Sequence, residues 1–82
     1  MIYFVYTNFQ QRDGAIGHTS TNFSSIEDAR MEYHAQLANQ YNPANRANNK
    51  WATVQLVEQT GYVVASETAS FEKVAAEGQS AK

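Results

Sequence analysis

The sequence contains no cysteine. This absence excludes a disulfide framework, a thiolate zinc site, an iron–sulfur cluster and a cysteine nucleophile. Secreted chains of this size are usually cross-linked, so we expect an intracellular, cytoplasmic protein. Residues 1–14 lack the basic region and apolar run of a signal peptide. No segment approaches the roughly 18 apolar residues that span a bilayer, so no membrane partner is expected either.

Charge is also scarce. Charged residues make up 17% of the 82 residues, and the net charge is -2. The six lysines and arginines are scattered, whereas proteins that bind nucleic acids cluster theirs. Nucleic acid is therefore a disfavoured partner, and the acidic excess is too small for a DNA mimic. Polarity comes instead from seven asparagines and seven glutamines, which suit recognition by short-range hydrogen bonds.

Periodicity predicts one folded domain over residues 1–78, with a frayed tail at 79–82. Alternating β-branched and aromatic residues indicate strands, and Asp13-Gly14 and Thr60-Gly61 indicate hairpin turns. Gly17 indicates a bulge in the second strand. The expected elements are strands at 1–9, 15–22, 51–59 and 62–68, a helix at 24–41, a loop at 42–50 and a short helix at 70–78.

The long helix has clear start and stop signals. Ser24 and Glu27 fit a capping box, and Asn42-Pro43 ends the helix. One apolar stripe runs along it at helical spacing. The members of that stripe are Ile26, Ala29, Tyr33, Leu37 and Tyr41. The terminal helix has Ser70 as its N-cap and is expected to dock through Phe71 and Val74.

These elements predict an α+β fold with a four-stranded, mainly antiparallel sheet in the order β-β-α-β-β. The long helix covers one face of the sheet, and the short helix is C-terminal. A single helix leaves the other face open, with Tyr3, Phe9, Trp51 and Tyr62 as candidates to line it. Exposed apolar faces usually mark interfaces, so we expect a homodimer or a larger homo-oligomer.

The expected contact groups lie on this sheet face and beside the helix and loop. They are Tyr3, Trp51, Tyr62, Arg30, His34 and Arg46. Arg30 either lays its stem on the core and keeps its charge in solvent, or anchors an interface. Stacking of nucleobases on the three aromatic side chains is disfavoured because no basic groove accompanies them.

Catalytic and metal-binding patterns are weak. His18 and His34 are the only side chains that titrate near neutrality, and no HExxH motif is present. We therefore expect no metal, no cofactor and no enzymatic activity. The alternative is a small enzyme with a histidine-containing site at a subunit junction. A possible anion or ligand site near the helix start comprises Arg12, His18, Ser20 and Asn22.

The segment SSIEDARMEYHAQLANQYN, at residues 24–42, belongs to a short, cysteine-free chain rich in Asn and Gln. In size and composition the chain resembles small accessory proteins of bacteriophages, including those that block bacterial immunity. The resemblance implies a non-enzymatic, homo-oligomeric inhibitor in the cytoplasm of a bacterial host. Such a protein occludes a host protein or sequesters a small nucleotide-like ligand. A purely structural phage or complex component is the alternative, and the resemblance transfers no individual residues.

Overall fold

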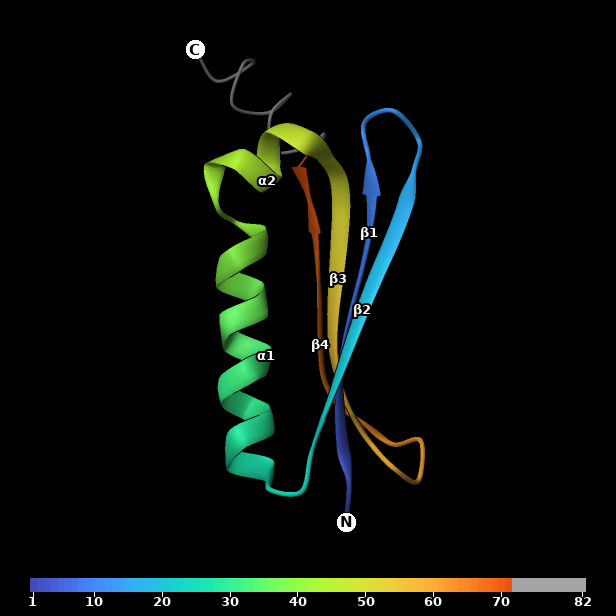
Figure 1. Cartoon of the computed structure of the whole chain (residues 1–82), viewed down its shortest axis with the longest axis vertical. Coiled ribbons are helices and arrows are strands. Elements are labelled where there is room, and N and C mark those ends of the chain that lie inside the picture. Colours follow the sequence, from blue (N-terminus) through green and yellow to red (C-terminus); the bar gives the residue numbers. More distant parts are fainter. Residues whose placement is uncertain (72–82) are drawn as a thin grey trace.

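A computed structural model describes residues 1–71. Within these residues, four strands and two helices follow one another (Figure 1). They are β1 (Tyr3–Gln11), β2 (Ile16–Phe23), α1 (Ile26–Gln40), α2 (Pro43–Asn48), β3 (Asn49–Glu58) and β4 (Val63–Ser70).

The strands form one antiparallel sheet in the order β2-β1-β3-β4, so the predicted α+β fold is confirmed. Each half of the chain contributes one hairpin. The turns contain Gly14 and Gly61, whose φ angles of 97° and 96° lie in the left-handed region that glycine tolerates. The two hairpins join through β1 and β3, which occupy the middle of the sheet.

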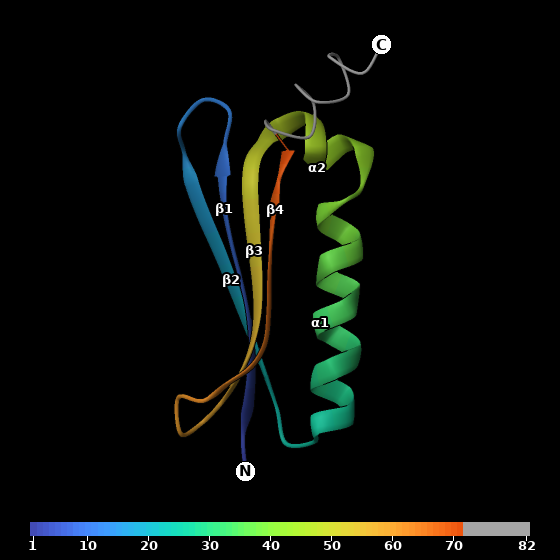
Figure 2. The ribbon, with the colours of Figure 1, turned by 180° about the vertical axis from the view of Figure 1, so that it is seen from behind.

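The core lies between α1 and one face of the sheet, and no other element within residues 1–71 covers the opposite face (Figures 1 and 2). Its buried members are Val5, Val54 and Leu56 from the sheet and Ala29 and Tyr33 from the helix. Ile26 and Leu37 pack against this cluster, so the predicted apolar stripe of α1 is confirmed up to Leu37. Tyr41 ends the helix and is exposed, although its ring packs against Phe71.

Tyr3 and Phe9 do not lie on the open face, so their predicted placement is wrong. Tyr3 packs against the core cluster under α1, and Phe9 packs against a smaller cluster of Ala52, Ala69 and Phe71. The alternation of β1 was predicted correctly, but both of its faces are apolar. The sequence alone therefore did not show which face the helix covers.

The N-cap of α1 lies one residue later than predicted, and a second helix that was not predicted follows α1. Ser25, not Ser24, is the N-cap, and its side chain accepts a hydrogen bond from the Asp28 amide. The predicted loop at 42–50 is wrong. Asn42 caps a second helix, α2, with Pro43 in its first turn, because a proline lacks only an amide that the first turn leaves unpaired.

The C-terminal prediction is tested only at its start. Ser70 is the last residue of β4 and not simply a helix N-cap. Phe71 is 3% exposed, which confirms that it docks on the domain. Val74, the remainder of the predicted 70–78 helix and the 79–82 tail lie outside the described residues. Within residues 1–71, neither helix combines the length and apolar character needed to cross a bilayer.

Candidate functional site

The sheet face that α1 leaves open presents four residues from each strand. Pairing across the strands places them in rows. We call this surface the uncovered face, and its members, from β2 through β1 and β3 to β4, are Asn22, Ser20, His18 and Ile16; Phe4, Tyr6, Asn8 and Gln10; Val57, Gln55, Thr53 and Trp51; and Val63, Ser66, Thr68 and Ser70. None of these residues carries a charge at neutral pH when histidine is counted as neutral.

Apolar side chains occupy both ends of the uncovered face, and polar ones occupy its middle. At one end the rings of Phe4 and Tyr6 stack with centroids 5.8 Å apart. At the other end the Trp51 indole nitrogen donates a 3.1 Å hydrogen bond to Gln10 Oε1, beside Ile16, which is 70% exposed. Cross-strand hydrogen bonds such as Thr53–Thr68, at 2.9 Å, hold the middle. These bonds fix part of the β1, β3 and β4 surface of the face.

The structure separates the predicted contact residues into two groups. Trp51 lies on the uncovered face, and Tyr62 lies in the β3–β4 turn, where it is 65% exposed. Arg30 and His34 are exposed on α1, on the other side of the sheet, and Arg46 is exposed on α2. With Tyr3 under the helix, these residues do not form one continuous site within a single chain.

The predicted anion site is also divided. His18, Ser20 and Asn22 share the uncovered face, as their alternation predicts. Arg12 instead lies beyond the end of β1 and donates hydrogen bonds to the α2 carbonyls of Ala47, at 2.8 Å, and Arg46, at 3.0 Å. These carbonyls are free because the last turn of a helix has no amides to satisfy them. Arg12 therefore links the first hairpin to α2.

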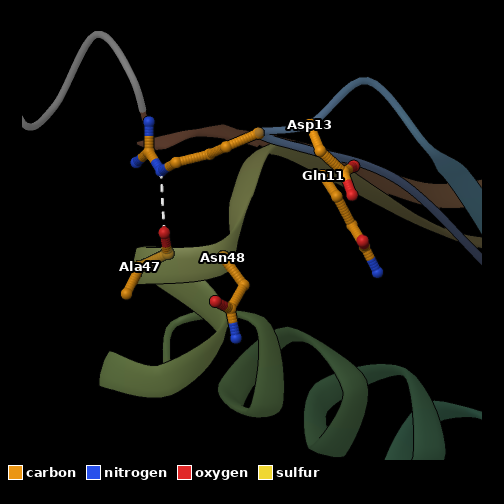
Figure 3. A pocket seen from close by; sticks show the side chains of 5 residues that line it. Gln11, Asp13, Ala47 and Asn48 are labelled. Atoms are coloured by element: carbon orange, nitrogen blue, oxygen red, sulfur yellow. Dashed lines mark hydrogen bonds between the residues drawn. The ribbon is translucent and has the colours of Figure 1, made fainter.

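A hollow of about 360 Å³ lies beside this link. Gln11 and Asp13 lie on one side of it and Ala47 and Asn48 on the other (Figure 3). Among residues 1–71, the only charged side chains that line it are Arg12 and Asp13, whose opposite signs offset each other. The hollow is wide and open, and we assign it no ligand of its own.

A second cavity, of about 270 Å³, lies between α1, α2 and the helix-facing side of the sheet. Seven of the ten described residues that line it have carboxamide side chains, and we call it the amide cavity. These seven are Gln11, Gln36, Asn39, Gln40, Asn45, Asn48 and Asn49. The other three are Thr7, Phe9 and Thr19.

Three residues of the amide cavity are nearly inaccessible to solvent, and one of them is Asn49, which is 5% exposed. Thr7 is 1% exposed and donates a 3.4 Å hydrogen bond to Gln36 Oε1. Gln40 is 5% exposed, and its Oε1 atom has no hydrogen-bond partner within residues 1–71. Sequence reasoning missed this cavity. The available signal was the concentration of Asn and Gln at 36–49, which was divided between the predicted helix at 24–41 and the predicted loop at 42–50.

Tyr33, within α1, and Tyr41, the C-cap residue of α1, have raised pKa values. Tyr41 donates a 3.0 Å hydrogen bond to Glu67, and that bond is the main cause of its raised pKa, followed by burial and the nearby Glu67 charge. Burial, and then the Glu67 charge, raises the pKa of Tyr33. Both phenols therefore stay protonated at neutral pH, and neither is prepared to act as a base.

The described residues, 1–71, contain neither a cluster of metal-ligating side chains nor a pair of neighbouring histidines. No three histidine or acidic side chains in that range gather closely enough to hold a metal ion. His18 and His34 are both exposed and lie on opposite sides of the sheet, so one chain cannot bring them together. An enzyme built on a histidine at a subunit junction stays a prediction.

Comparison with known proteins adds no relative. No protein family, curated protein or solved structure matches this chain. Proposals about function therefore depend on the two surfaces described above, the uncovered face and the amide cavity.

Proposed function

We propose that this chain is a non-enzymatic binding protein that pairs with a second copy of itself through the uncovered face. The absence of charge from that face is the observation that carries the proposal. Sheets that remain in solvent usually carry charged side chains, especially lysine, which prevent association. The centres of protein interfaces are instead poor in charge and rich in aromatic residues.

A second copy is the occupant that the pattern fits best. The face carries apolar side chains towards both ends, so an identical face can set apolar residues against apolar ones whichever way its strands run. The uncharged surface meets its own copy without like-charge repulsion, which a face bearing lysines or glutamates would suffer. Two-fold pairs of this kind are the commonest protein oligomers.

The available area is sufficient for a modest interface. Four strands about 4.8 Å apart and about seven residues long give a plan area of roughly 450 Å². Two such faces give about 900 Å² of plan area, and side-chain relief brings the accessible area towards the lower end of the roughly 1,200–2,000 Å² that stable interfaces bury. We therefore expect pairing that depends on concentration within the experimentally accessible range.

A pair of this kind exposes its helices on both outer surfaces. Arg30, His34 and Arg46 would then be available to a host protein, and the amide cavity to a small ligand. Either contact suits an inhibitor that works by occlusion or sequestration, which is the role the phage resemblance implies. Affinity capture from bacterial lysate, compared with an Arg30→Ala variant, tests the protein-binding form of this role.

Solution mass tests self-association directly. Sedimentation equilibrium from micromolar to millimolar concentration should show the mass rising from 9.2 kDa towards twice that value. Gln55→Lys places a charge in the middle of the uncovered face and should hold the mass at the monomer value. Gln59→Lys makes the same change in the exposed β3–β4 turn and should associate like the wild type. A wild-type mass that stays at 9.2 kDa up to millimolar concentration would refute pairing.

A further inference from the structure

The amide cavity lies on the helix-facing side of the sheet, opposite the uncovered face. A ligand bound there would not require self-association. We propose that the amide cavity is a binding site for a nucleobase.

The side-chain oxygen of Gln40 finds no hydrogen-bond partner among residues 1–71, which points to a missing partner. Its residue is more than nine-tenths buried, and buried carbonyl oxygens are nearly always hydrogen-bonded. Gln40 is one of the residues that line the cavity, so its carboxamide lies beside any molecule bound there. An exocyclic amino group or a ring N–H of a base provides a hydrogen-bond donor.

The other carboxamide side chains of the lining can form hydrogen bonds with the polar edge of a nucleobase. A carboxamide offers an acceptor and two donors in one plane, and Asn or Gln pairs with adenine through two hydrogen bonds. Part of this set is already oriented. Asn45 donates a 2.7 Å hydrogen bond to the Asn39 carbonyl, and Gln36 donates one of 2.7 Å to Glu32. These bonds fix the directions in which the remaining polar atoms are offered.

Phe9 supplies the aromatic part of the lining. The ring lies over Gly17, so closely that a side-chain carbon at residue 17 would overlap Phe9 Cζ and lie 2.7 Å from Phe9 Cε2. Because Gly17 has no side chain, the Phe9 ring can occupy the space that a side chain at residue 17 would fill. Single-stranded nucleic-acid binders use aromatic rings of this kind as surfaces for bases.

Charge and size favour a base over a larger or ionic ligand. Among residues 1–71, no charged side chain lines the amide cavity, so a phosphate would find no counter-charge there. The volume of about 270 Å³ equals that of about nine liquid water molecules at about 30 Å³ each, which suits a compact ring system. Gln11 and Asn48 also line the hollow beside Arg12, so a sugar or phosphate attached to the base has a route out of the cavity.

Titration of the full chain with adenosine, guanosine, cytidine and uridine tests the proposal. Side-chain amide signals in NMR should show saturable binding of at least one nucleoside, with glucose as a neutral hydrogen-bonding control. Gln40→Met keeps the length of the side chain but removes the carboxamide, and should weaken binding at least tenfold. Gln59→Met makes the same change in the exposed turn and should bind like the wild type.

Two further variants guard against a folding artefact. Gln40→Met should melt no lower than the wild type, because it removes a buried atom without a partner. Should it unfold, Asn45→Ala alters the same cavity from α2, where alanine favours the helix. Repeating the titration with Gln55→Lys separates the result from self-association.

Several outcomes would overturn the site. These are no nucleoside binding at millimolar concentration, glucose binding as well as any nucleoside, or unchanged binding by both cavity variants. Adenosine monophosphate gives a further check. If it alone bound, and binding were lost in Arg12→Ala but kept in Gln40→Met, the site would be a phosphate site in the neighbouring hollow.

Discussion

Leu56 should be the side chain on which the fold depends most heavily. It is 0% exposed, pairs with Val5 on β1 and Ala65 on β4, and belongs to the core cluster beneath α1. Leu56→Ala removes three carbon atoms from this cluster. The lost burial is worth about 2.4 kcal/mol at about 0.8 kcal/mol per carbon, and the residual cavity brings the usual total to about 2–5 kcal/mol.

That loss is large for a domain of this size. At roughly 0.05–0.15 kcal/mol per residue, 82 residues give an unfolding free energy of about 4–12 kcal/mol. Each kcal/mol lowers the melting temperature of a domain this small by about 4–8 °C. Leu56→Ala should therefore lower it by roughly 8–40 °C, as measured by circular dichroism at low protein concentration.

Val57 provides the matched control because it is the next residue and lies on the opposite face of the sheet. Val57→Ala should lower the melting temperature much less, since its side chain is only half-buried. Pairing makes the melting temperature rise with protein concentration. Val57→Ala should weaken that rise, whereas Leu56→Ala should retain it. Equal losses from the two substitutions at low concentration would show that the core does not lie where the structure places it.

Two other predictions concern the surroundings of the cavity and the helix. Gly17→Ala should destabilise the domain by about 1–3 kcal/mol, because its methyl group would displace the Phe9 ring; urea unfolding measures this, and a change within about 0.5 kcal/mol would contradict it. Alkaline pH should also destabilise the domain, since the folded state raises the pKa of Tyr41 above its ordinary value. This contribution is complete below about pH 10 and is lost as the pH rises through the folded pKa. Glu67→Gln should bring the phenolate absorbance transition of Tyr41 to lower pH, and an unchanged transition would exclude the hydrogen bond as its cause.

The sheet was predictable because its signals are local. Alternating apolar residues and the Asp13-Gly14 and Thr60-Gly61 turns define two hairpins, and the structure contains both. Helical spacing likewise identified the buried face of α1. Boundaries were less certain, as the choice between Ser24 and Ser25 as the cap shows, because both residues suit the position.

Positions that depend on tertiary packing were not predictable. The alternation of side chains along β1 was clear from the sequence. Which of its two faces is covered depends on where α1 docks, and alternation does not encode that. Gly17 did not produce a bulge. It pairs regularly with Phe9, and its role is to leave room for that ring. The amide cavity required α2, which packs beside residues distant in the chain, so the run of Asn and Gln alone did not reveal it.

The joining of β1 to β3 has a consequence for how the chain reaches its native state. Tyr3 meets Glu58 and Phe9 meets Ala52, so the central ladder connects residues separated by most of the sequence. Each hairpin pairs residues that are close in sequence, but neither encloses an interior until the other arrives. During synthesis the apolar side chains of the first hairpin therefore stay exposed to solvent until β3 has left the ribosome. Pairing between residues so distant in sequence is typical of proteins that fold slowly.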